Sequence, residues 1–265
     1  MQILKNVSWP VVCLVGILVI GCLGCCPEAE NVEGQRPLRP IVFVHGAWGG
    51  GWQFHKVEPL LRRAGHPVYR PTMTGLGERF HLATPEVGLT THIDDIVNML
   101  EFEQLEDVVL VGHSYGGMVI AGIAERVPQR IAQLVFLDAI VPEDGDSVMG
   151  LFGDAIDTMA TAGDDEAWQL VPRWVDDPDQ RPVDVPQPAK TFTDAITLAN
   201  TRAREIPATF IHTIEAGKDS DDFDAFADRA RARGWPVVVM TGGHNPHWFQ
   251  PESFVEVLLD TIAVP

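Results

Sequence analysis

Cysteine is absent from most of this chain. All four cysteines, Cys13, Cys22, Cys25 and Cys26, lie within the first 26 of 265 residues. A domain without cysteine cannot be held together by disulfide bonds, which excludes a small disulfide-stapled scaffold. With 46% hydrophobic residues, the chain is instead long enough to bury one sizeable core. We therefore expect a single main domain over residues 41–265.

Basic residues are also scarce. After Cys26 the chain holds 37 acidic and 18 basic residues, which gives this part a net charge of −19. Nucleic-acid binding needs clustered lysine and arginine, so a nucleic-acid partner is excluded. A negative surface also repels anionic substrates at long range, which favours neutral ones.

The N-terminal segment differs in composition from the rest. Lys5 precedes an uncharged stretch, residues 7–26, which is typical of an export signal. The run Val19-Ile20-Gly21-Cys22 resembles a bacterial lipobox, so we expect residues 1–26 to direct export, with cleavage before a lipid-bearing Cys22 and tethering to the membrane. The alternative is an uncleaved membrane anchor, because about 20 uncharged residues can just cross a bilayer. Residues 27–40 then form a linker rich in proline and glycine.

Six apolar segments are predicted to be buried strands. Helix-like segments separate most of them, and this alternation indicates an α/β fold, a mostly parallel six-stranded sheet with helices on both faces. The predicted strands are Ile41–Val44, His66–Arg70, Val108–Val111, Gln133–Asp138, Pro207–Ile214 and Pro236–Thr241.

One insertion interrupts this alternation. Residues 142–206 contain no long apolar strand, but aromatic residues such as Phe152, Trp168 and Trp174 are scattered along them. We expect a mostly helical cap over the carboxyl ends of the strands, where ligands of open α/β sheets bind.

The stretch from Val108 to Ile120 predicts a strand, a sharp turn and a helix. The turn reads Gly112-His113-Ser114-Tyr115-Gly116, a Gly-x-Ser-x-Gly nucleophile elbow in which the glycines avoid clashes as the backbone reverses. The following helix aims free N–H groups at developing negative charge. Ser114 is therefore the predicted nucleophile.

A serine hydroxyl is a weak nucleophile at neutral pH and needs a base. In a parallel sheet, only residues just beyond the carboxyl ends of strands converge on Ser114. This requirement excludes the histidines expected on helices or at a strand start, which are His55, His92 and His66. His244, after the last predicted strand, is the best-placed base, and His247 is the alternative.

Four motifs occur together from Pro40 onward: Val44-His45-Gly46-Ala47-Trp48, Val111-Gly112-His113-Ser114-Tyr115-Gly116-Gly117, Leu137-Asp138-Ala139-Ile140-Val141-Pro142 and Gly243-His244-Asn245-Pro246. Through them the sequence resembles the α/β-hydrolase superfamily, and most closely its compact branch of esterases and hydroxynitrile lyases. The resemblance implies an acyl-transfer hydrolase with a serine, a histidine and an acid. It also implies that the backbone N–H groups of Ala47 and Tyr115 bind the oxyanion.

The triad acid departs from the commonest arrangement of the superfamily, in which it follows the penultimate strand. Here Ala216 stands where a close relative would carry aspartate, and Glu215 and Asp219 are displaced from that position. Asp138 ends the strand after the elbow, where some members of the superfamily place the acid. We therefore predict Asp138 as the acid, with Asp219 and Glu215 as alternatives.

These residues predict a carboxylesterase that cleaves neutral, fairly hydrophobic small-molecule esters through an acyl-enzyme. No cofactor and no metal is expected, because His244 with His247 and the acidic residues 219–224 complete no recognised ligand set. One alternative is a hydroxynitrile-lyase-like enzyme, although Gly46 and Asn245 replace the threonine and lysine of such lyases. Another is a ligand receptor that has kept the hydrolase fold.

Overall fold

The structure, a computed structural model, describes residues 38–163 and 168–263. Six parallel strands form its main sheet in the order β2-β1-β3-β4-β8-β9, which confirms the predicted sheet. The strands are β1 (Ile41–Val44), β2 (Val68–Tyr69), β3 (Val108–His113), β4 (Ile131–Leu137), β8 (Ala208–Ile214) and β9 (Val237–Thr241). The predicted export signal, Cys22 and most of the linker lie outside the described residues.

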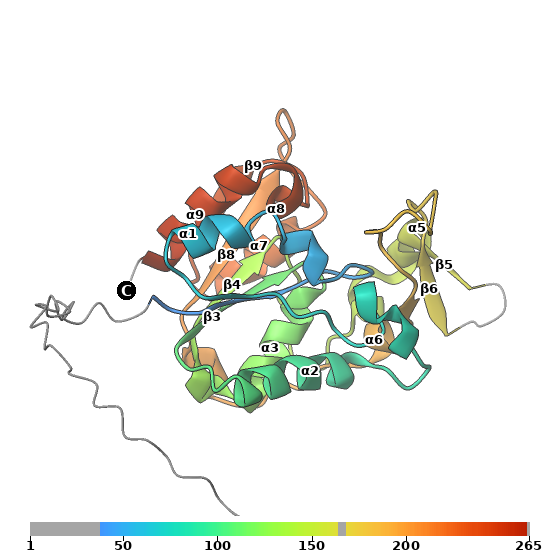
Figure 1. Ribbon diagram of the computed structural model, residues 1–265, viewed down its shortest axis with the longest axis horizontal. Coiled ribbons are helices and arrows are strands. Elements are labelled where there is room, and N and C mark those ends of the chain that lie inside the picture. Colours follow the sequence, from blue (N-terminus) through green and yellow to red (C-terminus); the bar gives the residue numbers. More distant parts are fainter. Residues whose placement is uncertain (1–37, 164–167, 264–265) are drawn as a thin grey trace, which may run out of the picture. The chain divides into compact units, whose positions relative to one another are not determined.

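Helices cover both faces of the sheet (Figure 1). In chain order the main helices are α1 (Glu58–Arg63), α2 (Leu89–Phe102), α3 (Gly116–Arg126), α7 (Asp224–Ala232), α8 (Pro246–Phe249) and α9 (Pro251–Ala263). Figure 1 shows α1 and α9 on one side of the sheet and α2 and α3 on the other. Between residues 38 and 263, leaving out 164–167, no helix is both long enough and apolar enough to cross a membrane.

The two faces follow from side-chain alternation along the strands. Ile41 and Phe43 of β1 belong to a buried cluster with α1 and α9, whereas Val42 and Val44 belong to one with α2, α3 and α7. Successive residues of a strand point to opposite faces, so a strand with apolar residues at every position is buried on both sides. This pattern explains why continuous apolar runs predicted the strands.

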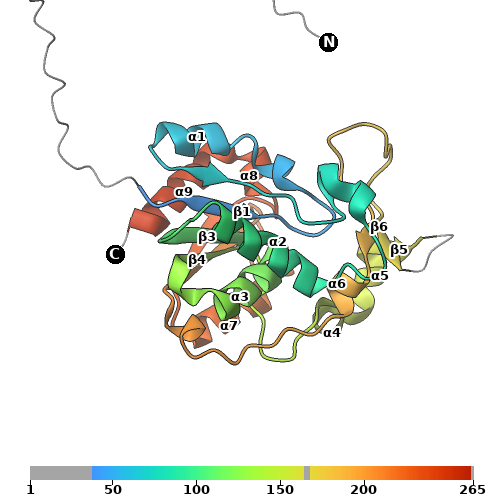
Figure 2. The same cartoon turned by 60° about the horizontal axis from the view of Figure 1, so that its bottom comes forward.

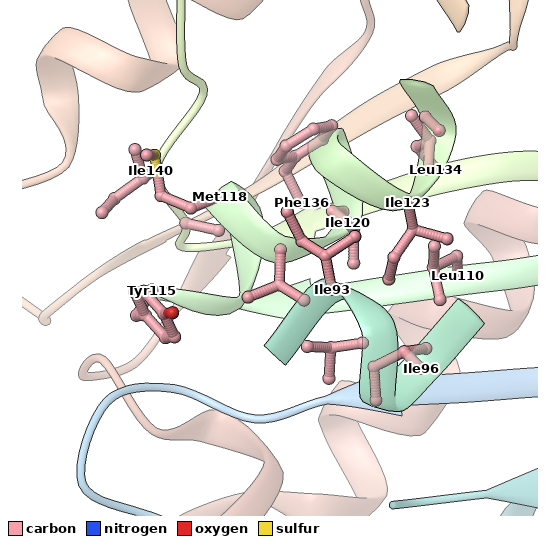
Figure 3. Close-up of a cluster of buried hydrophobic side chains, with 14 of the residues drawn as sticks. Ile93, Ile96, Leu110, Tyr115, Met118, Ile120, Ile123, Leu134, Phe136 and Ile140 are labelled. Carbon is pink, nitrogen blue, oxygen red and sulfur yellow. The ribbon is translucent and has the colours of Figure 1, made fainter. Parts of the chain in front are cut away.

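The packing of α2 against α3 depends on a glycine. Figure 3 shows Ile93 and Ile96 of α2 beside Ile120 and Ile123 of α3. A Cβ atom at Gly122 would lie 2.2 Å from the Cδ1 of Ile93, so a larger residue there would force the Ile93 side chain to move. Each such isoleucine, fully buried, contributes about 1.5–3 kcal/mol to stability, and together they fix α3 behind the Ser114 turn.

Residues 142–206 form the insertion between β4 and β8, and they contain strands as well as short helices. The helices are α4 (Val148–Phe152), α5 (Ile156–Met159) and α6 (Lys190–Thr193), and the strands β5 (Ala160–Ala162), β6 (Gln169–Pro172) and β7 (Gln187–Pro188) form an antiparallel sheet of their own. Figure 2 shows these elements gathered on one side of the main sheet. The expectation of a mostly helical insertion therefore missed a three-stranded sheet.

Candidate active site

Strand register brings the predicted site residues together. His113 at the end of β3 pairs with Leu137 at the end of β4, so Ser114 and Asp138 follow on adjacent strands. Val44 pairs with Gly112, which places the loop after β1 beside the same turn. The chain steps from β1 to β2 on one side and from β3 to β4 on the other. The site thus lies at the topological switch point, where open α/β sheets bind ligands.

The backbone reverses sharply at Ser114. Its φ is +54°, a left-handed value that is strained for a residue with a side chain. The Ser114 carbonyl accepts hydrogen bonds from the N–H groups of Gly117 and Ile140, both at 3.0 Å, and these hold the turn. A Cβ atom at Gly117 would lie 2.1 Å from the carbonyl oxygen of Ile140, so only glycine fits there. The side chain of Ser114 is left partly exposed beyond the strand.

Two backbone donors flank this serine. Within the described residues, the N–H groups of Ala47 and Tyr115 make no hydrogen bond. Tyr115 immediately precedes α3, and the loop that carries Ala47 runs against the turn, because a Cβ atom at Gly46 would lie 3.1 Å from the Cβ of Ser114. Free N–H groups beside a helix N-terminus are suited to binding an oxyanion.

His244 and Asp138 are joined by a hydrogen bond. The Nδ1–H of His244 donates to Oδ2 of Asp138 over 2.7 Å. This bond fixes the neutral tautomer of the imidazole, so that Nε2 carries the lone pair that accepts a proton. The His244 side chain is 36% exposed and that of Asp138 only 1%, as expected for a base that faces substrate and an acid that does not.

Asp138 occupies a second strained position. Its φ is +42°, and its own N–H donates to the carbonyl of Ile211 over 2.8 Å. The other carboxylate oxygen, Oδ1, accepts the N–H of Thr213 over 3.2 Å. Because one oxygen is hydrogen-bonded to β8 and the other to His244, the buried carboxylate has a defined orientation.

Two rings that the sequence analysis did not assign to the site hold His244 in place. Phe223 stacks on the imidazole at 4.7 Å between ring centroids and 18° between planes. His113 packs at 4.6 Å, and its Nε2–H donates to the carbonyl of His244 over 2.8 Å. Nothing in the sequence marks Phe223 for this position, because only folding brings it to the end of β9.

A small polar cluster fixes Phe223 in turn. Oδ1 of Asp221 accepts the backbone N–H of Phe223 over 2.7 Å and also lies 2.9 Å from Nε2 of His212. His212 is 2% exposed, and its other nitrogen, Nδ1, is buried without a hydrogen-bond partner among the described residues. The cluster links β8 to the loop that precedes α7.

Three further histidines near the site are buried. Burial lowers the pKa of His247 to about 3, and it lowers the pKa values of His45 and His92 to about 4. His247 packs between Phe54 and His113, and neither of its ring nitrogens has a hydrogen-bond partner within the described chain. His247, the alternative base, therefore makes no hydrogen bond to an acid, whereas His244 does.

The alternative acids are both exposed, although Glu215 lies near the loop of the base, with its Oε1 3.6 Å from where a Cβ of Gly243 would stand. Glu215 pairs with Lys218 over 2.7 Å, and both side chains are more than half exposed. Asp219 is exposed in the same loop. Among the described residues neither carboxylate bonds to His244, so the geometry favours Asp138.

One group of side chains has the composition of a metal site. Ligand atoms of Asp138, His212 and Asp221 lie within 4.8 Å of one another. The residues already satisfy each other and their neighbours, since Asp138 binds His244 and Thr213 while His212 binds Asp221. A metal bound here would draw the Asp138 carboxylate away from His244. The three residues therefore fit the observed hydrogen bonds better than they fit a metal centre.

Comparison with known proteins decides the family, because the sequence profile described as "Alpha/beta hydrolase family" matches residues 41–257. The chain belongs to the alpha/beta hydrolase family. It is 52% identical over 122 residues to the carbendazim hydrolyzing esterase of Nocardioides sp. (strain SG-4G), which covers 46% of this chain and 50% of that one. It is 37% identical over 104 residues to salicylic acid-binding protein 2 of Nicotiana tabacum, covering 39% and 40%.

The chain spans about half the length of the curated relatives it matches. Its fold is similar to the solved structure of an extracellular alpha/beta-hydrolase from a Paenibacillus species, with a TM-score of 0.70 and 21% identity. That superposition covers 84% of this chain and 98% of the other. A likeness at this identity shows the shared fold, whereas the chemistry depends on the residues of the site.

Proposed function

We propose that this protein is a serine carboxylesterase that hydrolyses neutral, fairly hydrophobic esters through an acyl-enzyme. The observation that carries the proposal is the hydrogen bond from His244 to the buried Asp138, which directly follows β4, the strand next to the one that leads to Ser114. A serine on a strained turn, a base in a fixed tautomer and an orienting carboxylate are the parts that acyl transfer requires.

In the proposed reaction, the Oγ of Ser114 attacks the ester carbonyl carbon while Nε2 of His244 takes the hydroxyl proton. Asp138 stabilises the resulting imidazolium. When the tetrahedral intermediate collapses, the C–O bond to the alcohol breaks and His244 returns the proton to the leaving oxygen. A water molecule, deprotonated by the same nitrogen, then attacks the acyl-enzyme. The acyl C–O bond to Ser114 breaks, His244 returns the proton to Oγ, and the acid is released.

The oxyanion of each tetrahedral intermediate is bound by the N–H groups of Ala47 and Tyr115. Both groups lack a hydrogen bond within the described residues, so they are available to the substrate oxygen. Loss of one such donor in enzymes of this kind costs about 3–4 kcal/mol of transition-state stabilisation.

Charge and aromatic side chains support the proposed substrate class. The net charge of −18 disfavours anionic substrates at long range. Trp48, immediately after Ala47, packs against Trp174 and Phe192 of the insertion. The relatives named carbendazim hydrolyzing esterase and methylesterase support small esters or related acyl compounds as substrates.

The test is turnover of p-nitrophenyl butyrate by the full-length protein and its Ser114→Ala variant. We expect the wild type to release nitrophenol and the variant to lose more than 99% of that rate, because the other hydroxyl of the turn, that of Tyr115, is buried against His92. Ser147→Ala is the matched control, since Ser147 only caps α4 by accepting the N–H of Gly150. If Ser114→Ala keeps more than a few per cent of the rate, the assignment of Ser114 as the nucleophile is refuted. A wild type without turnover would favour a lyase or a receptor. A panel of esters, with carbendazim included, would then define the acyl and alcohol preferences.

A further inference from the structure

Trp48 joins the loop after β1 to the insertion through three hydrogen bonds. Its backbone N–H donates to Oε1 of Gln187 over 2.6 Å, and its carbonyl accepts the N–H of Val185 over 2.9 Å. Its indole Nε1–H donates to the carbonyl of Leu170 over 2.9 Å. Gln187 and Leu170 are paired neighbours on β7 and β6, so one small sheet holds both the backbone and the side chain of Trp48.

The backbone of Trp48 adopts an intrinsically unfavourable conformation. Its φ is +61°, in the left-handed region that is unfavourable for a bulky residue. Such a conformation persists only where the surroundings impose it. Trp48 directly follows Ala47, so rotation about the Trp48 backbone would also turn the peptide groups that lead to the Ala47 N–H.

The hydrogen bonds around Gln187 leave its side-chain amide one orientation. The residue is fully buried. Its Nε2 donates to the hydroxyl of Thr191 over 2.7 Å. That hydroxyl in turn donates to the carbonyl of Pro188, also over 2.7 Å. Because Thr191 can only accept from Gln187, the amide oxygen must face the N–H of Trp48.

The same segment also contacts the second oxyanion donor. Phe192, the residue after Thr191, stacks on the ring of Tyr115 with 5.9 Å between centroids and 2° between planes. Phe192 also packs on Trp48 at 5.3 Å. Phe192 therefore lies against Tyr115, one of the two proposed oxyanion donors, and against Trp48, the residue that follows the other donor, Ala47.

We infer that Gln187 is a positioning residue, which holds Trp48 in its left-handed conformation and thereby aims the N–H of Ala47 at the oxyanion. This inference rests on the proposed esterase function. It assigns to the insertion a part in catalysis, since a side chain 139 positions away from Trp48 fixes the loop that stabilises the transition state.

The variant that tests this role is Gln187→Met, which keeps the length of the side chain and removes its acceptor. We expect kcat for p-nitrophenyl butyrate to fall about tenfold to 100-fold, with KM within about twofold, because a misplaced donor weakens transition-state binding far more than substrate binding. Hydrogen exchange of the Trp48 amide should become at least about tenfold faster, because its N–H loses its partner.

Two other substitutions at this contact separate positioning from packing. Gln187→Glu retains an oxygen at the same place, and because burial raises the pKa of a carboxyl, the neutral acid can accept from Trp48 and donate to Thr191. It should keep kcat within about threefold. Thr191→Val removes the hydroxyl that orients the amide, and should lower kcat by a factor between those of Gln187→Glu and Gln187→Met. This variant tests the role of Gln187 independently if Gln187→Met does not fold.

Gln133→Met is the matched control. Gln133 is another buried glutamine, and its Nε2 donates to the carbonyl of Thr261, between β4 and α9. Its loss should lower the melting temperature without changing kcat. The role of Gln187 is refuted if Gln187→Met and Thr191→Val keep wild-type kcat while Ser114→Ala loses it. If the wild type turns over no ester, the proposed function fails, and the role assigned to Gln187 fails with it.

Discussion

Replacement of Asp138 by asparagine should disable the base without disturbing the fold around it. The two carboxylate oxygens have different partners, since Oδ1 accepts the N–H of Thr213 and Oδ2 accepts the Nδ1–H of His244. An asparagine must place its carbonyl oxygen toward the Thr213 N–H, because an NH₂ group there would face another donor. Its NH₂ group then faces Nδ1 of His244.

That orientation forces His244 into the wrong tautomer. Nδ1 must accept from the asparagine, so the proton moves to Nε2, and Nε2 can no longer take the proton of Ser114. The corresponding change in a serine protease lowers kcat about 10⁴-fold. At 1.36 kcal/mol per tenfold change this loss is about 5 kcal/mol of barrier, and we expect the same order here, with KM little changed.

The measurement is steady-state hydrolysis of p-nitrophenyl butyrate, with circular dichroism to show that the variant is folded. Asp219→Asn and Glu215→Gln are the controls, since both residues are exposed and neither bonds to His244 within the described chain. We expect both to keep near-normal kcat. A near-normal kcat for Asp138→Asn, together with a large loss of kcat in either control, would refute the assignment of Asp138 as the acid.

Two further predictions concern stability and location. Burial holds the pKa values of His45 and His92 at about 4 and that of His247 at about 3, all below the value of about 6.5 in an unfolded chain. Unfolding therefore takes up protons, and stability that is complete above pH 6.5 is lost as the pH falls toward 4. His247→Phe should lessen this fall by about 1.4 kcal/mol per pH unit in urea titrations, whereas an unchanged slope would mean that His247 is not held neutral. Cys22→Ala should release active protein from the membrane fraction, as the lipobox-like sequence predicts; unchanged retention would support an uncleaved anchor.

The sequence predicted the main sheet because its strands are buried on both faces. Runs such as Val108-Val109-Leu110-Val111 are apolar at every position, and glycines at the following turn mark where the strand ends. Since parallel strands end at one edge of a sheet, Ser114, Asp138 and His244 could be expected near one another before any register was known.

The insertion was less predictable because its structure depends on partners. β7 comprises only Gln187 and Pro188, too short for any pattern to show, and it exists because Leu170 pairs with it. Phe223 and Gln187 likewise carry no local signal, since the first meets His244 and the second meets Trp48 only after folding. Short-range patterns do not report such contacts.

The position of Asp138 also has a practical consequence for the loop after β8. The carboxylate that binds His244 belongs to the residue directly after β4, and the exposed stretch from Glu215 to Asp219 has no hydrogen bond to the imidazole within the described residues. Gly217 has a φ of +83° and open space around it, with no atom within 4 Å of where a Cβ would stand. This tip offers a place to insert an affinity tag or a fluorescent label, so that the enzyme can be immobilised or followed without altering its chemistry.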